Sequence, residues 1–249
     1  VEDIRDLANE VITPLQLDVT NEVSIAAALE RVKAEAGGVD ILVNNAGFGL
    51  MGPLAELPLA EVRRQLETNV VGPLALVQAL VPYMVKQGGG RIVNVGSASG
   101  VLTTPFSGAY SASKAALHSL SDAMRMEMAP FGIGVITLKP GKIASKFGDT
   151  ATRLLRELIP PSSIYLPVVG FMEKRALASQ SGATDATQIA KKIVRAVTSK
   201  RPRRLVRHGK NSWIMPFLSW GFPLALTDCV LSRLFGLHLL RQSRENSRS

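Results

Sequence analysis

The sequence predicts an α/β fold built on a doubly wound parallel sheet within a single domain. Short apolar runs of the length of buried strands alternate with longer segments whose apolar residues recur at helical spacing. The chain has 249 residues, 46% of them hydrophobic and 20% charged, which suits one sizeable core. No linker divides the chain, and no internal repeat suggests a solenoid.

Each element follows from a local pattern. In the first helical segment the apolar residues from Val23 to Ala36 fall on one broad face, and Gly37 and Gly38 end the helix. We expect strands at residues 13–19, 39–43, 91–95, 133–138 and 204–206, helices at residues 22–36, 59–86, 108–130 and 185–200, and irregular chain with helical patches at residues 145–182.

Helices of this length between strands imply parallel βαβ units. In open sheets of this kind, ligands bind beyond the carboxyl ends of the strands. The residues that directly follow each strand are therefore the first candidates for a functional site.

Residue counts exclude several classes of site. The single cysteine, Cys229, rules out an internal disulfide framework and a cysteine-based zinc site. The three histidines, His118, His208 and His238, lie far apart, with no carboxylates at metal-ligand spacing, so no metal site is predicted. We expect His118, eight residues after Tyr110, to be a packing or interface residue and not a catalyst.

The net charge of +9 belongs to the end of the chain. Residues 190–249 contain 13 basic and two acidic residues, whereas residues 1–189 contain 16 basic and 18 acidic residues. At this basic end of the chain, the aromatic residues are grouped with aliphatic residues and do not alternate with Arg or Lys. Nucleic-acid binding is therefore not predicted.

An uncharged, aromatic-rich segment at residues 211–227 accompanies the basic residues. It is too short for a spanning helix and contains Pro216 and Pro223. It is either an interfacial or substrate-capping segment, or it packs on the core. The first alternative implies peripheral contact with a membrane through residues 201–227. The positive charges just before the uncharged segment are Arg201, Arg203, Arg204, Arg207 and Lys210.

Tyr110 and Lys114 lie four residues apart in Tyr-Ser-Ala-Ser-Lys, and so share one face of the predicted helix. An ammonium beside a phenol favours the phenolate and lowers the tyrosine pKa, so the pair is suited to proton transfer. The spacing alone is also typical of two exposed helix residues.

Small and polar residues follow four predicted strands. Ser97 ends one strand and is placed to bind a substrate oxygen, or else it caps a turn. The Asn-Asn-Ala-Gly loop at residues 44–47 allows close backbone approach to a flat ligand, or else it is an ordinary turn. Asp18 ends a further strand, and Pro140 begins the loop after another.

These residues together resemble the short-chain dehydrogenase/reductase family over about residues 10–206. The family's Asn-Asn-Ala-Gly motif stands at residues 44–47, its catalytic serine at Ser97, and its Tyr-x-x-x-Lys pair at Tyr110 and Lys114. The remaining matches are Asn69 in Thr-Asn-Val-Val-Gly, Asp18 and Val19 at the adenine site, and Pro140, Gly141, Ile143 and Ser145, the last in place of the usual threonine.

The resemblance implies a Rossmann-like fold and a set of roles. Tyr110 is the general acid or base, Ser97 polarises the substrate carbonyl, and Lys114 lowers the pKa of Tyr110 and holds the nicotinamide ribose. Asn69 interrupts a helix and holds a water that links Lys114 to solvent. The cofactor-binding residues that it implies are Asp18, Val19, Asn44, Ala46, Gly47, Tyr110, Lys114, Pro140, Gly141, Ile143 and Ser145.

The family's Gly-rich phosphate-binding turn does not occur in this sequence. We expect the chain to begin on the helix before the family's third strand, which makes the domain N-terminally truncated, without its first two strands. Either the sequence is an incomplete copy of a complete enzyme, which the intact catalytic residues favour, or it is an inactive binding or scaffold protein. In both cases the 249-residue chain is expected to bind a dinucleotide poorly.

The segments around Tyr110 and residues 115–132 resemble the lipid-active branch of the family, which contains 1-acyl-dihydroxyacetone-phosphate reductases, 17β-hydroxysteroid dehydrogenases and retinol dehydrogenases. This resemblance implies a lipophilic substrate, NADP as cofactor with NAD as the alternative, and a location in the cytoplasm or on an intracellular membrane. The family further implies a homo-oligomer that is formed through residues 59–86 and 108–130. We expect a domain over residues 1–206 and a basic, apolar extension over residues 207–249.

Overall fold

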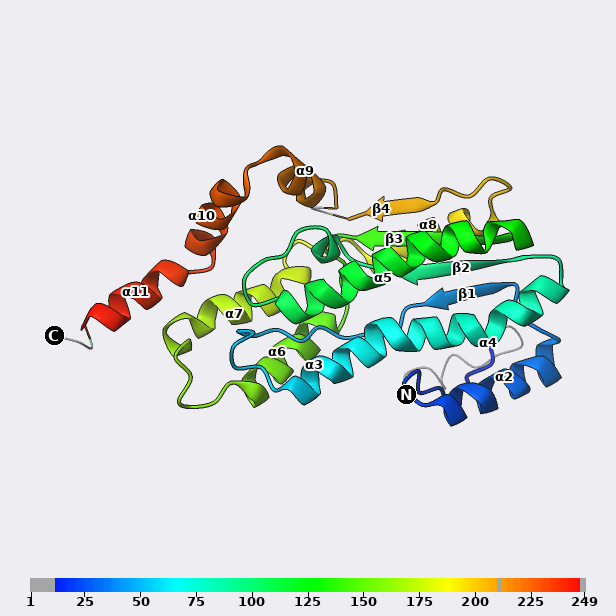
Figure 1. Ribbon diagram of the computed structural model, residues 1–249, viewed down its shortest axis with the longest axis horizontal. Coiled ribbons are helices and arrows are strands. Elements are labelled where there is room, and N and C mark those ends of the chain that lie inside the picture. The colour runs from blue at the N-terminus through cyan, green and yellow to red at the C-terminus, as the bar shows by residue number, and fades with distance from the viewer. Residues whose placement is uncertain (1–11, 210–211, 247–249) are drawn as a thin grey trace.

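A four-stranded sheet forms the centre of the protein, in a computed structural model that describes residues 12–209 and 212–246 (Figure 1). All of its strand pairs are parallel and follow chain order, β1 (Ile41–Asn44), β2 (Gly90–Val95), β3 (Ile133–Pro140) and β4 (Leu205–His208). The predicted α/β fold with a doubly wound parallel sheet is confirmed.

Helices connect the consecutive strands. Between β1 and β2 run α3 (Leu59–Leu66), one π-helical turn (Glu67–Val71) and α4 (Gly72–Lys86). Between β2 and β3 runs α5 (Gly108–Glu127), and Figure 1 shows α4 and α5 side by side across one face of the sheet. The remaining helices of the sheet region are α2 (Glu22–Ala36), α6 (Phe147–Leu158), α7 (Val169–Ala176) and α8 (Ala186–Thr198).

Successive strand residues supply two separate cores because side chains alternate across a sheet. Ile92 and Val135 face α4 and α5, where they pack with Val77, Met84 and Met124. On the opposite face, Val93, Ile136 and Leu138 pack with the apolar side of α8, including Ile189 and Ile193. The sheet is therefore covered on both faces, which is why its strands are nearly continuous apolar runs.

The helical stretch Leu59–Lys86 is long and apolar enough, by length and composition, to cross a membrane. However, Leu76, Val77, Leu80 and Met84 of this stretch are buried within the protein. Its apolar character is explained by packing on the sheet.

Residues 13–19 do not form the predicted strand. A strand needs a hydrogen-bonded neighbour, and in the described part of the chain β1 is the edge strand on this side of the sheet. Leu15, Leu17 and Val19 instead line a narrow cavity of about 220 Å³ together with residues of α2, β1 and α4. The helix predicted to precede this segment falls on residues 1–11, outside the described residues.

Residues 145–182 are more helical than the sequence predicts. They contain α6 and α7, separated by a turn of 3₁₀-helix (Leu166–Val168). Two buried clusters hold these helices in place, since Ala151 packs near Tyr110 while Leu155 and Met172 pack with Phe106.

The chain after the sheet forms α9 (Ile214–Gly221), α10 (Leu224–Leu234) and α11 (Leu237–Asn246), which lead away from the sheet (Figure 1). Phe235 and Leu237 pack against the cluster around Met172. In contrast, Trp213 is 71% exposed and Trp220 is 91% exposed. The described part of the segment, residues 212–227, is therefore mostly on the surface. The division into a domain and an extension at residue 206 stays a prediction.

Candidate active site

Ser97 lies directly after β2, at the start of a turn of 3₁₀-helix (Ala98–Gly100). Its Oγ accepts a hydrogen bond from the backbone N–H of Ser99 at 3.1 Å. Its own backbone N–H donates to Nε2 of the buried His118 at 3.3 Å. Ser97 therefore does cap a turn, and because its Oγ acts there as an acceptor, its O–H remains available to donate.

Tyr110 and Lys114 lie in the first two turns of α5, and both are buried. The Nζ of Lys114 donates to the backbone carbonyl of Val95, at the end of β2, at 2.7 Å. The ring of Tyr110 packs on Phe147 of α6, with 5.2 Å between the ring centroids. Tyr110 and Lys114 are thus held in a dry environment beside the end of β2.

Burial sets the protonation of this pair. It raises the pKa of Tyr110 above its ordinary value, although the Ser97 hydroxyl and the charge of Arg175 act to lower it. Burial also lowers the pKa of Lys114 to about 8. The role of Lys114 in lowering the tyrosine pKa stays a prediction; in this structure its ammonium donates to Val95, and Arg175 is the cation that acts to lower the pKa of Tyr110.

Asn69 lies in the π-helical turn between α3 and α4, where the long helix departs from regular α-geometry as predicted. Its side chain is fully buried and forms two hydrogen bonds with the loop after β1. Oδ1 accepts from the N–H of Phe48, and Nδ2 donates to the carbonyl of Phe48. Nδ2 also lies 3.0 Å from the hydroxyl oxygen of Ser113 in α5. The role of Asn69 in holding a water stays a prediction.

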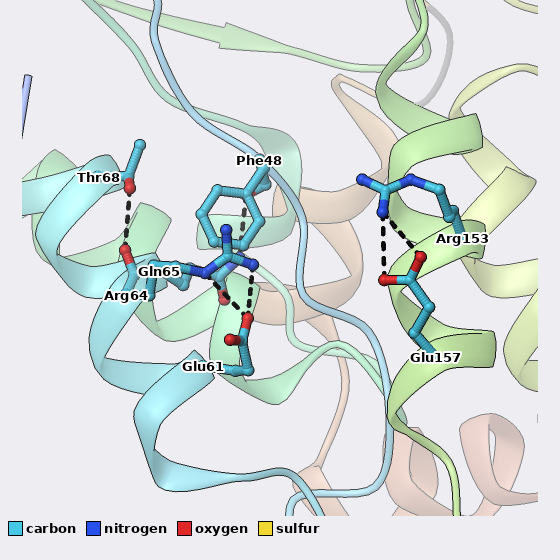
Figure 2. Close-up of polar contacts among 7 residues, drawn as sticks. All are labelled: Phe48, Glu61, Arg64, Gln65, Thr68, Arg153 and Glu157. Atoms are coloured by element: carbon cyan, nitrogen blue, oxygen red, sulfur yellow. Dashed lines mark hydrogen bonds and ion pairs between the residues drawn. The ribbon is translucent and has the colours of Figure 1, made fainter. Parts of the chain in front are cut away.

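Figure 2 shows how side chains of α3 also contact Phe48 in this loop. Nε2 of Gln65 donates to the carbonyl of Phe48 at 2.9 Å, and the guanidinium of Arg64 lies 4.6 Å from the centroid of the Phe48 ring. Glu61 in turn forms an ion pair with Arg64. The loop that contains Gly47 is therefore fixed by two side chains of α3 and by Asn69.

Gly47 is required by close packing. A Cβ at this position would lie 2.8 Å from Oδ1 of Asn69 and 3.8 Å from Nζ of Lys114. Because the loop carries no side chain here, its backbone runs close to Lys114 and leaves the adjoining cavity open.

A cavity of about 530 Å³ lies at the carboxyl ends of the strands and joins these residues. Its polar wall contains Ser97, Tyr110 and Lys114, and its apolar wall contains Phe147 and Phe235. The other predicted site residues that line this cavity are Gly47, Pro140, Gly141, Ile143 and Ser145.

The remaining predicted cofactor residues lie elsewhere. Val19, Asn44 and Ala46 line the second cavity beside β1, and the Asp18 carboxylate is exposed and accepts from the N–H and hydroxyl of Thr20. Asn44 donates to Oδ1 of Asn94 at 2.8 Å and so joins β1 to β2. The roles of Asp18, Val19, Asn44 and Ala46 in cofactor binding stay predictions.

The structure adds residues that were not predicted to lie at the site. Arg175 of α7 and Ser99 line the large cavity, and His118 lies under Ser97. Local sequence offers no signal for Arg175, because it follows Glu173 and Lys174 in a helix that resembles any exposed helix.

A family model described as short chain dehydrogenase matches residues 1–153, which contain Ser97, Tyr110 and Lys114. The chain belongs to the short-chain dehydrogenase family. Members of this family are NAD(P)-dependent oxidoreductases, and the sequence resemblance is confirmed.

Two curated relatives act on lipids according to their names. Over 135 residues the chain is 41% identical to 3-ketodihydrosphingosine reductase of Bacteroides thetaiotaomicron, a match that covers 54% of this chain and 50% of that protein. Over 151 residues it is 38% identical to human 17-beta-hydroxysteroid dehydrogenase type 1, covering 61% of this chain and 45% of that protein. The chain thus spans about half the length of these two relatives.

Solved structures share the fold over most of the chain. A short-chain dehydrogenase from Streptomyces avermitilis is similar at a TM-score of 0.74 and 27% identity, covering 98% of this chain and 84% of the other. A short-chain dehydrogenase/reductase from Burkholderia phymatum, solved in complex with NAD, is similar at a TM-score of 0.70 and 26% identity, covering 82% of this chain and 74% of the other.

Proposed function

We propose that the protein interconverts a carbonyl and an alcohol on a lipophilic substrate, with NADP as cofactor and NAD as the alternative. One observation carries the proposal: Ser97, Tyr110 and Lys114 converge on a single cavity whose other walls are largely apolar. Cavities of about this size with a few converging polar groups are typical of small-molecule sites.

The cavity suits the nicotinamide half of the cofactor. Gly47 leaves open the space beside Lys114 that a side chain would narrow, and the Lys114 ammonium makes one hydrogen bond, to Val95, of the three that it can donate. Lys114 and the loop at Gly47 would hold the ribose, and Gly141 and Ser145, which line the same cavity, would lie beside the nicotinamide. When bound, the cofactor supplies or accepts the hydride.

The side chains of the cavity then account for the proton. In the direction of reduction, the Tyr110 hydroxyl donates its proton to the carbonyl oxygen as the carbonyl carbon gains a hydride. The Ser97 hydroxyl donates a hydrogen bond to the same oxygen, since its own Oγ already accepts from Ser99. Burial keeps Tyr110 protonated, and so favours its role as the acid.

The proposed lipophilic substrate has two kinds of support. The apolar wall formed by Leu102, Phe147, Met215 and Phe235 offers a surface for an acyl or polycyclic group. The names of the sphingosine-base and steroid relatives point to the same class of molecule.

We further propose that α9 and α10 contact an anionic intracellular membrane, the protein being otherwise cytoplasmic. Phe217 and Trp220 of α9 are 68% and 91% exposed, and Leu224 of α10 is 76% exposed. Arg207 stacks on Trp213 just before α9, with 5.4 Å between the guanidinium carbon and the ring centroid. An apolar face next to positive charge suits an interface of anionic lipids.

A homo-oligomer through α4 and α5 is also part of the proposal. Val71, which directly precedes α4, is 46% exposed, Val85 near the end of α4 is 40% exposed, and Met126 of α5 is 63% exposed. Light scattering coupled to size-exclusion chromatography should give a mass above that of one chain, and a single-chain mass would contradict it.

The test of the activity is oxidation of NADPH and NADH with a panel of lipophilic ketones. Two proteins should be compared, the 249-residue chain and a form extended upstream in its natural reading frame, each with a Tyr110→Phe variant. We expect turnover in the extended form, and a loss of about a hundredfold or more in Tyr110→Phe, because general acid catalysis contributes at least that much. Absence of turnover in both forms would instead favour an inactive binding or scaffold protein.

A further inference from the structure

We propose that Arg175 forms an anion-recognition site inside the substrate cavity, so that the substrate carries a carboxylate or phosphate group close to its carbonyl as well as an apolar tail. This inference rests on the proposed function, because it names the substrate class of the same site. It assigns a binding role to a residue outside the motifs that the family resemblance covers.

Arg175 is fixed in the cavity wall by two hydroxyl groups. It lies in the last turn of α7, is partly buried, and lines the same cavity as Tyr110. Its Nε donates to Oγ1 of Thr104 at 2.7 Å, and its Nη2 donates to Oγ of Ser99 at 3.2 Å. Both acceptors belong to the loop that links Ser97 to α5, so the guanidinium is held on the substrate side of the catalytic residues.

The charge of Arg175 has no acidic partner among the side chains that the structure describes, those of residues 12–209 and 212–241. The nearest acid along its own helix, Glu173, is engaged in an ion pair with Arg156 of α6 at 2.7 Å. A guanidinium has five N–H donors, of which Thr104 and Ser99 take two. The other three have no protein acceptor in the described chain, and a planar fork of N–H groups is the usual partner of carboxylates and phosphates.

Even a partly buried cation without a counter-ion is costly. Burial lowers the pKa of Arg175 below its ordinary value, and among the described residues the charge that opposes this shift is that of the Tyr110 phenol in its ionised form. A bound anion would offset this cost in the loaded cavity, since charges taken out of water are normally paired.

The position of Arg175 indicates where the anion lies in the substrate. Arg175 is hydrogen-bonded to Ser99, two residues from Ser97, and shares the cavity wall with Tyr110, so it lies near the carbonyl that Ser97 and Tyr110 would bind. The cavity beyond it continues along Leu102, Met215 and Phe235. An amphiphile with an anionic group a few bonds from its carbonyl would place its three parts against Tyr110, Arg175 and this apolar wall.

Arg175 has one competing explanation, that it only ties the Ser99–Thr104 loop to α7. Arg175→Gln separates the two roles, because a glutamine amide can still donate to these hydroxyls but carries no charge. Lys174→Met is the matched control, since it removes one positive charge from the neighbouring, exposed position of the same helix.

The experiment is calorimetric titration of the 249-residue protein with decanoate, decyl phosphate and 1-decanol, which share one chain length and differ in the head group. For the wild-type protein we expect tighter binding of the two anions than of the alcohol. In Arg175→Gln the anions should bind about tenfold to a hundredfold more weakly, because hydrogen bonds to charged groups are lost. Binding of 1-decanol should change by less than about twofold, and Lys174→Met should resemble the wild-type protein. The anion whose affinity for the wild-type protein exceeds that of 1-decanol by the larger factor identifies the natural group as a carboxylate or a phosphate.

Three results would overturn the proposal: equal affinity of the wild-type protein for all three probes, an equal loss of all three in Arg175→Gln, or an equal loss of anions in Lys174→Met. If Arg175→Gln does not fold, Arg175→Lys serves in its place and should retain a preference for anions, and the absence of that preference counts against the site. Calorimetry needs no turnover, so a failure of the ketone assay would remove the proposed activity and leave the result at Arg175 intact.

Discussion

The backbone amide of Ser97 donates a hydrogen bond to Nε2 of His118, with 3.3 Å between the two nitrogen atoms. His118 reaches this position because Gly96 and Gly100 carry no side chains, and a Cβ on Gly96 would lie 2.2 Å from Nε2. The expectation that His118 is only a packing residue is therefore incomplete, since it also orients the start of the turn that carries Ser97.

His118→Phe should lower kcat for a neutral ketone by about tenfold and change KM little. The reason is that the buried Ser97 amide would lose its acceptor, at a cost of about 1–3 kcal/mol, and the turn would shift. Steady-state kinetics of the enzyme that shows turnover would measure this effect. His118→Gln, which restores a side-chain acceptor, should recover part of the loss, and equal activity in all three proteins would contradict a positioning role.

The stability of the protein should fall as the pH drops below about 6.5. Burial lowers the pKa of His118 to about 3, so between about 3 and 6.5 the unfolded chain binds a proton at His118 that the folded chain does not. The free energy of unfolding therefore decreases with falling pH across that window. Urea unfolding at pH 4.5 and 7 should show a smaller difference in His118→Phe than in the wild-type protein, and equal differences would contradict the prediction.

A second titration is expected at alkaline pH. Burial lowers the pKa of Lys114 to about 8, whereas an unfolded lysine titrates near 10.5, so the unfolded chain holds the extra proton between these values. Lys114 should therefore make stability rise from about pH 8 to pH 10. Above about pH 10 the raised pKa of Tyr110 acts in the opposite sense, so the comparison ends there.

Lys114→Met isolates this effect. It removes the titrating ammonium, so its stability relative to the wild-type protein should be greatest near pH 7.5 and should diminish toward pH 9.5. Between pH 7.5 and 9.5 the change is about 2 kcal/mol, because about 1.5 pH units of the interval between the two pKa values are covered. A constant gap between the two proteins in urea unfolding would show that Lys114 keeps an ordinary pKa.

The residues of the catalytic pocket that lie close to one another in the sequence could be predicted. Ser97, Tyr110 and Lys114 belong to one strand–turn–helix unit, so their spacing already places them at the end of β2. Arg175 was not predictable, because only the packing of α6 and α7 over the strand ends brings it to the cavity.

Residues 13–19 show that a local pattern can also predict an element that does not form. The alternation of Leu15, Leu17 and Val19 predicts a strand, but a strand exists only when a neighbour supplies hydrogen bonds. In the described chain the apolar side chains of this segment line the cavity beside β1 instead. Local pattern predicted a strand here, but in the described chain the backbone has no pairing partner and Leu17 is 38% exposed.

Gly47→Ala should weaken cofactor binding. The added methyl group would lie 2.8 Å from Oδ1 of Asn69, so the loop must move away from α3 or toward Lys114 and the cavity. We expect KM for the cofactor to rise about tenfold, measured by NADPH oxidation. Gly170→Ala is the control, because a Cβ there meets nothing within 4 Å and a helical alanine should raise stability by about 0.5–1 kcal/mol. An unchanged KM in Gly47→Ala would mean that the cofactor does not approach this loop.

Phe217→Ser should release the protein from anionic vesicles. Phe217 of α9 is 68% exposed, and transfer of its ring into a lipid interface stabilises binding by about 1.5–3 kcal/mol, so its loss should lower the partition coefficient about tenfold or more. The matched control is Leu59→Ser at the start of α3, where the side chain is 67% exposed but lies far along the chain from α9 and its neighbouring positive charges. Sedimentation with phosphatidylserine-containing vesicles should show the loss for Phe217→Ser alone, and added salt should weaken binding because Arg201, Arg203 and Arg204 are exposed. Equal losses in the two variants, or equal binding to vesicles of neutral phosphatidylcholine, would rule out α9 as a membrane contact.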